Sequence, residues 1–318
     1  MLQSIEKFAR RIRAKQKLQS AKSAEGRQIS VEFTLDEARF RKYGTPKDSL
    51  YLTVKNEAEV QTQLDRDIHR VEKGLALRKP KRPFGVDLLK RLDFLRTRSQ
   101  LRLDSDLNEV DRAIADLGRW NDEGEISDLS APPFFKYEVP ESFDLSEFFW
   151  RRKSVRVFKP QAVAESLIET AVDLARNSPS VCNRQSWRVY AINSEPLLSE
   201  VLPLQNGNES FRSEIPVALV ITSDLQKFSG AGERNQVWVD GGLFAMSLAW
   251  ALHGLGLGTC MLNWSVLNSQ SELLRSKINI SDSEEIITLM AVGHPEENIR
   301  YARSEKKSVS DILFWPKA

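Results

Sequence analysis

The chain has 318 residues, of which 41% are hydrophobic and 28% charged, proportions typical of a soluble globular protein with one large or two ordinary domains. A formal net charge of +2 excludes a global electrostatic attraction to nucleic acid or membranes. The two cysteines, Cys182 and Cys260, form no C-x-x-C pair, and the three scattered histidines suggest no metal site. We therefore expect a cytoplasmic protein without a disulfide framework or a metal.

Residues 1–30 place apolar side chains at helical spacing with basic residues between them, which predicts a basic helix or arm. The basic residues are Lys7, Arg10, Arg11, Arg13, Lys15, Lys17, Lys22 and Arg27. A solvated helix is the favoured interpretation, and a surface for anionic lipid, nucleic acid or an acidic partner is the alternative. Apart from this segment, the chain carries no strong nucleic-acid or membrane signal. It also lacks the uninterrupted apolar core of a secretory leader.

The segments up to residue 140 are predicted to be mostly helical. An apolar stripe predicts a helix over 56–78, prolines and Gly85 then break the chain, and 86–119 returns to helical character. Residues 31–54 show only a turn signal at Gly44. The proline-rich stretch 121–140 is typical of a linker. We therefore expect a helical region of unknown role over 1–140 and a second domain over 141–318.

Strands and helices alternate after the linker, which indicates a layered core. The expected helices are Val163–Ala175 and Val239–His253, and the expected strands are Trp187–Ile192, Ile215–Thr222, Leu257–Leu262 and Ile286–Val292. The stretch from Gly241 to Trp264 holds no charged residue. Glycines near its end favour a buried helix running into a buried strand over a membrane span.

A basic, hydroxyl-bearing segment runs from Arg151 to Phe158. On a helical turn Arg152 and Arg156 would share a face, with Ser154 close to both. Guanidinium groups, a hydroxyl and free backbone amides are the donors that bind phosphate. Taken alone, however, such a segment is more typical of a solvated basic turn.

Two further segments suit a polar heteroaromatic ring. The loop Ser178–Gln185 offers donors and acceptors from the side chains of Ser180, Asn183, Arg184 and Gln185. The glycine-rich segment from Gly256 precedes a strand that ends at Asn263, and ligands tend to bind beyond strand ends in α/β sheets. Each segment alone is also typical of an ordinary connection, and both cysteines are interpreted as small apolar residues.

The order of these segments is more specific than any one of them. The series is Arg-Arg-Lys-Ser-Val-Arg-Val-Phe, Ser-Pro-Ser-Val-Cys-Asn-Arg-Gln-Ser-Trp, Gly-Leu-Gly-Thr-Cys-Met-Leu-Asn and Ala-Val-Gly-His-Pro-Glu. It resembles the FMN-dependent nitroreductase family over residues 147–315. The resemblance implies an α+β fold with α/β/α layers, a nitroreductase-like flavin fold, which here carries a mostly helical N-terminal extension. It also implies bound FMN, NADH or NADPH as reductant, and a homodimer with FMN at the interface.

By position, the resemblance assigns the FMN phosphate and ribityl chain to Arg152, Ser154 and Arg156, and we include Lys153 between them. A second basic phosphate contact is expected in the tail, at Arg303, Lys306 or Lys307.

The ring contacts come from other segments. Ser180 and Asn183 match a loop that, in this family, meets the flavin bound mainly by the other subunit. Leu262, Asn263 and Trp264 match the segment whose backbone passes the reactive edge of the ring near N5. An asparagine that faces the ring corresponds to Asn206 or Asn208. The chain departs from the family at Ser186, where proline is usual, and at Asn263, where several members carry glutamate.

We therefore expect an FMN-dependent oxidoreductase that works by ping-pong hydride transfer from NAD(P)H, through flavin N5, to a nitro, quinone, enone or sugar-linked acceptor. No catalytic side chain is expected, because the cofactor performs the chemistry. The alternative is a flavin-binding or flavin-free partner protein without turnover in polysaccharide biosynthesis. The segment His69–Leu75 resembles a subgroup often encoded with polysaccharide-biosynthesis genes. It is either a helix end at Gly74 or a lid whose His69, Arg70 or Lys73 reaches the active site.

Overall fold

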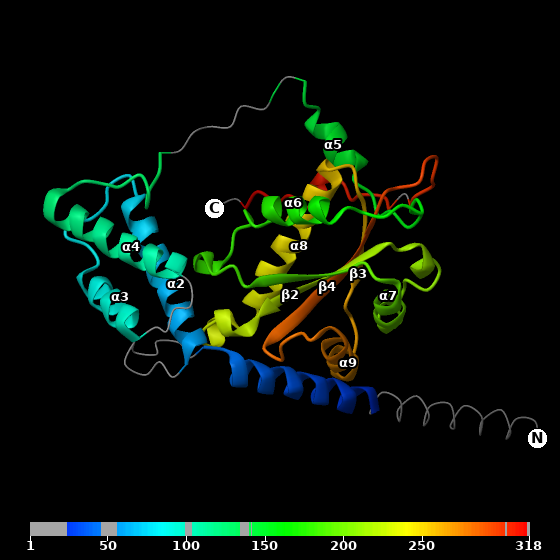
Figure 1. The fold of residues 1–318 in the computed structure, drawn as a ribbon, viewed down its shortest axis with the longest axis horizontal. Coiled ribbons are helices and arrows are strands. Elements are labelled where there is room, and N and C mark those ends of the chain that lie inside the picture. Colours follow the sequence, from blue (N-terminus) through cyan, green and yellow to red (C-terminus); the bar gives the residue numbers. More distant parts are fainter. Residues whose placement is uncertain are drawn as a thin grey trace, which may run out of the picture.

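The computed structural model describes residues 24–45, 56–98, 104–133, 140, 142–302 and 304–316. Figure 1 shows an antiparallel sheet between layers of helices, with a helix bundle beside it. The strands are β1 (Trp187–Ile192), β2 (Val217–Asp224), β3 (Gly258–Asn263) and β4 (Glu284–Gly293). The helices are α2 (Glu57–Leu75), α3 (Val86–Arg98), α4 (Asp104–Glu123), α5 (Leu145–Arg151), α6 (Glu165–Ala175), α7 (Glu195–Val201), α8 (Gln236–Gly254) and α9 (Asn268–Ile278).

The four strands lie in the order β1-β2-β4-β3, and every neighbouring pair is antiparallel. All four expected strands are confirmed, because runs of β-branched and apolar residues suit a sheet that is covered on both faces. Their alternating direction means that the rule for the carboxyl ends of parallel strands does not apply. The position of Asn263 must therefore be judged from its own contacts.

Helices cover both faces of the sheet. One face packs against α6 and α8 through residues such as Ala171, Phe244 and Leu219. The other face packs on a core that includes Leu198 of α7 and Leu274 of α9. These contacts confirm the α/β/α layering of an α+β fold. Helix α8 runs into buried β3, as expected for the uncharged stretch, and among the described helices none has the length and apolarity to cross a membrane.

Helices α2, α3 and α4 form a bundle with its own core, in which Leu64, Leu92 and Leu117 are fully buried. The helical stretch expected over 86–119 is in fact divided into α3 and α4, because Leu92 and Leu117 both face α2 across the same core. The carboxylate of Asp67 is also buried within the bundle, where Arg91 donates two hydrogen bonds of 2.9 Å to it.

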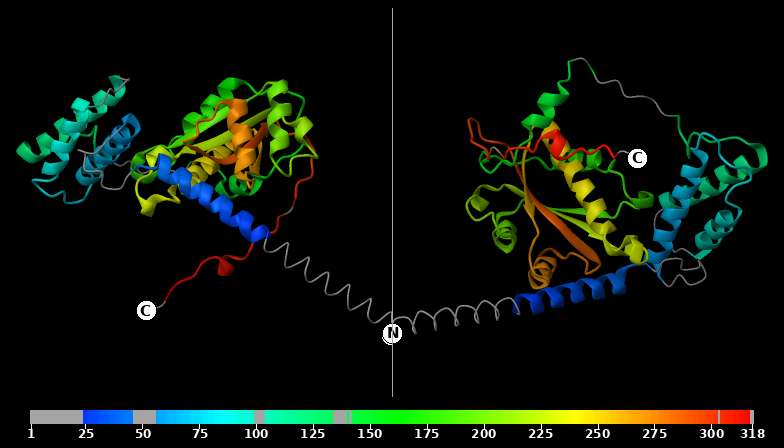
Figure 2. Two further views of the ribbon diagram at one scale, coloured as in Figure 1. Left: turned by 90° about the horizontal axis from the view of Figure 1, so that it is seen from below. Right: turned by 180° about the vertical axis from the view of Figure 1, so that it is seen from behind.

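The helix over residues 24–43 packs away from this bundle, along the C-terminal part of the chain. Arg39 forms a 2.9 Å ion pair with Glu285 of β4, and the Asn268 amide at the start of α9 donates to Glu32 at 2.9 Å. Figure 2 shows this helix beside α9 from two further sides. The described residues before 140 thus pack in two separate groups: the helix over 24–43 against the C-terminal part of the chain, and α2–α4 against one another. The division of the chain into domains at residue 140 stays a prediction. Most of the basic segment 1–30 lies outside the described residues.

Candidate cofactor site

The basic segment leaves α5 in an extended conformation, and we call Arg152–Phe158 the anchor segment. Helix α5 begins at the Asp144 cap, whose carboxylate accepts from the Glu147 amide, and it ends at Arg151. Beyond it, Ser154 pairs with Thr259 at the start of β3, and the Val155 amide donates to the Thr259 carbonyl at 2.9 Å. The helical turn considered for Arg152 and Arg156 is therefore wrong, since pairing with β3 holds the segment extended.

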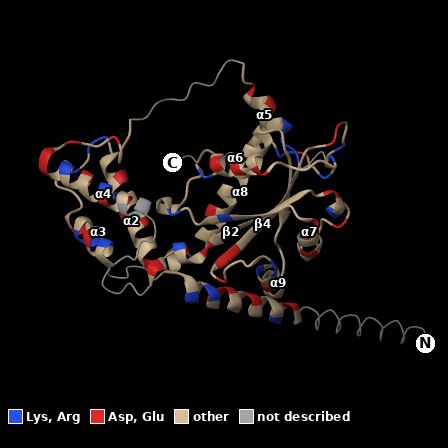
Figure 3. Ribbon diagram, in the orientation of Figure 1, with Lys and Arg blue, Asp and Glu red and all other residues tan. Residues whose placement is uncertain are grey.

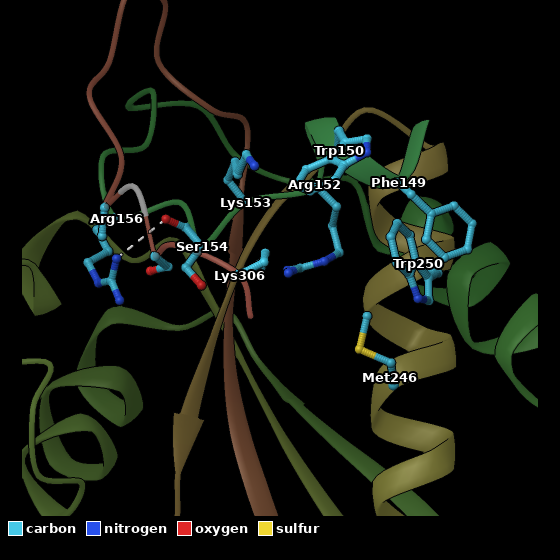
Figure 4. A pocket seen from close by; sticks show the side chains of 11 residues that line it. Phe149, Trp150, Arg152, Lys153, Ser154, Arg156, Met246, Trp250 and Lys306 are labelled. Carbon is cyan, nitrogen blue, oxygen red and sulfur yellow. Dashed lines mark hydrogen bonds between the residues drawn. The ribbon is translucent and has the colours of Figure 1, made fainter. Parts of the chain in front are cut away.

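The anchor segment lines a cavity of about 250 Å³ together with α5, α8 and the C-terminal tail. Its polar lining comprises Arg152, Lys153, Ser154, Arg156, Ser304 and Lys306. Its apolar wall comprises Phe149, Trp150, Met246 and Trp250. Figure 4 shows the Arg152 guanidinium extending between Lys306 and Trp250, with Ser154 between Lys306 and Arg156. We call this cavity the basic pocket.

The cations of the basic pocket are held by rings and backbone. Arg152 lies 5.6 Å from the Trp250 ring centre, and Lys153 lies 5.7 Å from that of Trp150. Arg156 contacts the Ser154 carbonyl at 3.5 Å. Within the part of the chain that the structure describes, no ion pair joins these cations, or Lys306, to a carboxylate. Four positive charges without an acidic partner around one hydroxyl favour an anionic ligand.

The tail residues differ in their position. Both lysines are exposed, but Lys306 lines the basic pocket, whereas Lys307 is absent from the described lining. Arg303 lies outside the described residues. Of the three tail candidates, Lys306 is the one that the described structure brings to the anchor segment.

Gly258 allows the close approach of the anchor segment to β3. A Cβ at this position would lie 2.9 Å from Val155 Cβ, closer than packed carbon atoms tolerate. Two residues further along β3, Cys260 is buried, and this burial raises the pKa of its thiol. A buried thiol with a raised pKa is a poor nucleophile, which agrees with its interpretation as a small apolar residue.

The other end of β3 carries the residues expected near the ring. Leu262 is buried in the core, so it offers its backbone rather than its side chain. Asn263 is exposed, and its carbonyl accepts from Gln205 Nε2 at 3.0 Å. The Trp264 indole donates to Ser271 of α9 at 2.9 Å, which fixes it as a packing residue.

The loop after α7 lies against this strand end. Asn206 is exposed beside Gln205, whereas Asn208 is buried and donates to the Leu202 carbonyl at 2.7 Å. Of the two asparagines considered for the ring, Asn206 is therefore the accessible one. Gln205 Oε1 is buried next to Asn263 and has no hydrogen-bond partner among the described residues, so this strand end has an unused acceptor.

The segment Ser180–Gln185, which we call the left-handed loop, has an unusual backbone. The φ angles of Cys182, Asn183 and Gln185 are 50°, 52° and 46°, a region that non-glycine residues rarely adopt. Ser180 Oγ accepts from the Gln185 amide at 3.0 Å and so closes the loop. Such strain persists only where surrounding contacts impose it, and it clusters at functional sites.

Arg184 anchors the left-handed loop and does not serve a ligand. Its side chain is fully buried and forms two 2.8 Å hydrogen bonds with Glu233. Its interpretation as a ligand donor is wrong, because Glu233 and the Lys227 carbonyl already occupy the guanidinium. Ser180 and the exposed Asn183 and Gln185 are the members of the loop that remain accessible.

The left-handed loop and the basic pocket lie at different positions along α8. The Val181 amide donates to Asp240 at 3.0 Å near the start of the helix, whereas Trp250 lines the pocket near its end. Ten residues separate these positions, about 15 Å along a helix. Within one chain, the basic pocket therefore brings together Arg152, Lys153, Ser154, Arg156 and Lys306. Ser180 and Asn183 lie outside this pocket, near the start of α8.

Sequence reasoning missed the aromatic wall of the basic pocket. Trp150 lies in α5, a short helix that the sequence did not predict, and Trp250 lies in a stretch that was interpreted only as buried. One feature of the sequence could have indicated this wall: α8 has no polar face. A helix that is apolar on all sides is normally covered on all sides, so its side away from the sheet should contact another group.

Part of the chain is similar to known proteins of one family. Residues 150–205 and 196–294 match the model of the nitroreductase family. A 4-nitrobenzoate reductase from Pseudomonas putida is 26% identical over 46% of this chain and 83% of its own length. An NADH dehydrogenase from Thermus thermophilus is 23% identical over 46% of this chain and 84% of its own. An FMN-dependent nitroreductase from Clostridium difficile, a solved structure, is 19% identical and covers 54% of this chain and 98% of its own, with a TM-score of 0.46.

Proposed function

Because the chain belongs to the nitroreductase family through residues 150–294, we propose that it is an FMN-dependent oxidoreductase that uses NADH or NADPH. The observation that carries the proposal is the basic pocket. Arg152, Lys153, Arg156 and Lys306 surround Ser154 and have no carboxylate partner among the described residues. A phosphate monoester matches this set, because its oxygens accept from several charged donors at once.

The donor set also fits the remainder of FMN. The ribityl hydroxyls would find Ser154 and the carbonyls of the extended anchor segment. The ring would pass the strand end at Asn263, where the carbonyl and the buried Gln205 Oε1 offer acceptors. Bound FMN would supply the redox chemistry, taking a hydride from NAD(P)H and passing it to an acceptor. The chain's own residues bind and orient, and we assign no catalytic side chain.

The size of the basic pocket supports a site shared between two chains. Pockets that enclose a small ligand usually measure ~300–1,000 Å³. The cavity of about 250 Å³ is therefore large enough for the phosphate end of FMN and leaves the ring to another surface. The left-handed loop, about 15 Å away along α8, is a suitable surface only if a second copy presents it.

Helix α8 offers the face for such a homodimer. Trp238, Val239 and Leu243 are 48%, 50% and 43% exposed, although the opposite face of the helix is buried on the sheet. A helix that is apolar on all sides is normally covered on all sides. The stripe lies between the left-handed loop at Asp240 and the pocket wall at Met246 and Trp250. A two-fold contact here would bring each loop towards the other chain's pocket.

The compound that accepts the hydride from the flavin is a nitro, quinone, enone or sugar-linked compound. The second candidate function is a partner protein without turnover. Helices α2–α4 favour it, because they have a core of their own and so present a surface that could bind another protein. The test is the visible spectrum of the purified protein under anaerobic conditions. A yellow protein that NADPH or NADH bleaches, and that a nitro or quinone acceptor restores, supports the enzyme. A colourless protein that FMN does not reconstitute contradicts it.

A further inference from the structure

A second polar cavity, of about 240 Å³, lies where helices α2 and α4 meet the left-handed loop. Its charged and polar lining includes Asp65, His69, Glu72, Glu109, Asn183 and Gln185. Helix α2 supplies the first three, α4 supplies Glu109, and the loop supplies the two amides. We call this cavity the acidic pocket. Figure 3 shows acidic segments on α2 and α4 of this bundle and basic segments where α5 enters the anchor segment.

The acidic pocket explains the segment His69–Leu75. Val71 and Leu75 are buried in the bundle core, and a Cβ on Gly74 would lie 2.2 Å from Phe84 Cζ, so these positions serve packing. Arg70 is exposed and pairs at 3.1 Å with the buried Asp67, one turn earlier on the same helix. His69 and Glu72, in contrast, face the pocket beside Asn183. The segment is thus a packed helix whose one polar face meets the left-handed loop.

Helix α2 is fixed in this position by contacts with the C-terminal part of the chain. Thr62 donates to the Gln226 carbonyl at 2.8 Å, and Lys227 forms a 2.8 Å ion pair with Asp65. Arg66 contacts the Ser229 hydroxyl at 3.4 Å, one turn further along the helix. The acidic pocket therefore has a defined shape next to the left-handed loop.

The charge of the acidic pocket is negative. Its lining holds three carboxylates and, among the described residues, no lysine or arginine. Arg112 reaches Glu72 at 3.0 Å and also contacts Glu109, while Lys227 neutralises Asp65. Two cations thus face three carboxylates. His69 does not neutralise the one remaining negative charge near neutral pH, because burial and, to a lesser extent, Lys73 lower its pKa below 6.5.

We propose that the acidic pocket is the acceptor subsite, and that it selects acceptors bearing amine or hydroxyl donors over acceptors bearing a carboxylate. The inference rests on the proposed function, in which the left-handed loop lies against the flavin of the second copy. An acceptor placed there would extend between Asn183, Gln185 and α2. Carboxylates only accept hydrogen bonds, so Glu72 and Glu109 match a donor-rich ligand and repel an anion. His69 and Glu72 are then specificity-determining residues.

Two matched probes test the proposal: 4-nitrobenzylamine, which is a cation near neutral pH, and 4-nitrobenzoate, an anion. In each turnover NAD(P)H supplies a hydride and water supplies a proton, which convert the nitro group to a nitroso group and release water. We expect a higher kcat/KM for the amine. Glu72→Gln should lower the amine-to-carboxylate ratio of kcat/KM by about tenfold, the size of one partly screened charge at close range. Its FMN content should stay near wild type, because Glu72 is absent from the described lining of the basic pocket.

Glu169→Gln is the matched control, because Glu169 is exposed on α6, away from the acidic pocket. It should leave the ratio unchanged. A wild-type protein that prefers the carboxylate, or a Glu72→Gln variant with the wild-type ratio, overturns the inference even if the protein proves to be a flavin enzyme.

A binding measurement separates this inference from the proposed function. The chain has three histidines, so the ring signals of His69 can be assigned in an NMR spectrum with a His69→Gln variant. Titration of the protein as purified with 4-nitrobenzylamine should shift the His69 signals and leave those of His253 and His294 in place. This readout holds even if the protein carries no FMN, a result that would end the proposed function alone. Unmoved His69 signals would overturn the acceptor subsite.

Discussion

The Val155 amide donates a 2.9 Å hydrogen bond to the Thr259 carbonyl, and this bond ties the anchor segment to the start of β3. Because Thr259 is buried and β3 is paired with β4, this contact holds Ser154 and its basic neighbours at one position relative to α8. The cations therefore meet at the basic pocket before any ligand arrives, and this preorganisation reduces the entropy lost on binding.

Replacing Gly258 with Ala should disturb this arrangement. The new Cβ would lie 2.9 Å from Val155 Cβ and push the anchor segment off β3. We expect a loss of about 1–3 kcal/mol in the free energy of unfolding from overpacking, and weaker FMN binding. Urea denaturation and flavin content measure the two effects. Gly118→Ala in α4, where a Cβ meets nothing within 4 Å, is the control and should retain FMN. Full FMN affinity in Gly258→Ala would show that the close approach is not needed.

The homodimer depends on the exposed face of α8. Leu243 is 43% exposed in one chain, and a lysine there would place a charge in the proposed apolar interface. Leu243→Lys should yield a folded monomer in analytical ultracentrifugation, with reduced flavin content although the residue is absent from the described lining of the basic pocket. The exposed Leu174→Lys on α6 should leave the dimer intact. A Leu243→Lys protein that stays dimeric and yellow would place the interface elsewhere.

Gly74→Ala tests the packing role of the segment His69–Leu75. Helix propensity alone would make alanine about 1 kcal/mol more stable. The new Cβ, however, would lie 2.2 Å from Phe84 Cζ, and the Phe84 backbone is held by two hydrogen bonds with Asn121. We expect a net loss in the free energy of unfolding, of about 1–2 kcal/mol once propensity is set against overpacking. A gain of stability would mean that Phe84 moves aside freely.

The preference for an amine acceptor should fall as the pH falls. Burial lowers the pKa of His69 below 6.5, so the ring is neutral at pH 7 and gains a positive charge below its folded pKa. Burial raises the pKa of Glu72 above 4.5, so this carboxylate loses its charge earlier than usual on acidification. Both changes make the acidic pocket less negative. Asp65, Glu109, Lys73 and Arg112 also surround the pair.

The ratio of kcat/KM for the two nitro probes, followed from pH 8 to pH 5, measures this effect. His69→Gln should remove the change in this ratio that occurs at the higher pH, where His69 titrates. The change at lower pH, where Glu72 loses its charge, should remain. A ratio independent of pH in the wild-type protein would contradict the assignment.

Local patterns predicted the layered core well, and long-range contacts explain what they missed. The strand expected over Trp187–Ile192 has the same bounds in the structure, where its side chains pack on the two cores that cover the sheet. The spacing of Arg152 and Arg156 suggested a helical turn, yet pairing with β3, about a hundred residues later, holds them extended. The bidentate contact of Arg184 with Glu233 likewise depends on two distant loops.

The acidic pocket could not be predicted from the sequence, because it too depends on contacts between distant segments. His69 and Asn183 are separated by the whole linker and meet only because α2 docks on the loop after β2. The periodicity of α2 indicated that Val71 and Leu75 are buried, and left the partner of its polar face open.

The central claim is that the basic pocket holds the FMN phosphate. Its most direct test is a titration of flavin-free protein with FMN, comparing wild type with the variant in which both Arg152 and Arg156 are replaced with Ala. Each lost charged hydrogen bond costs about 1.5–3 kcal/mol, so the dissociation constant should rise by roughly a hundredfold or more, while circular dichroism and the melting temperature stay near wild type. Arg176→Ala, which removes an exposed arginine just after α6 that pairs with Asp173, should bind FMN as wild type does. A double variant that binds FMN with unchanged affinity would contradict the account.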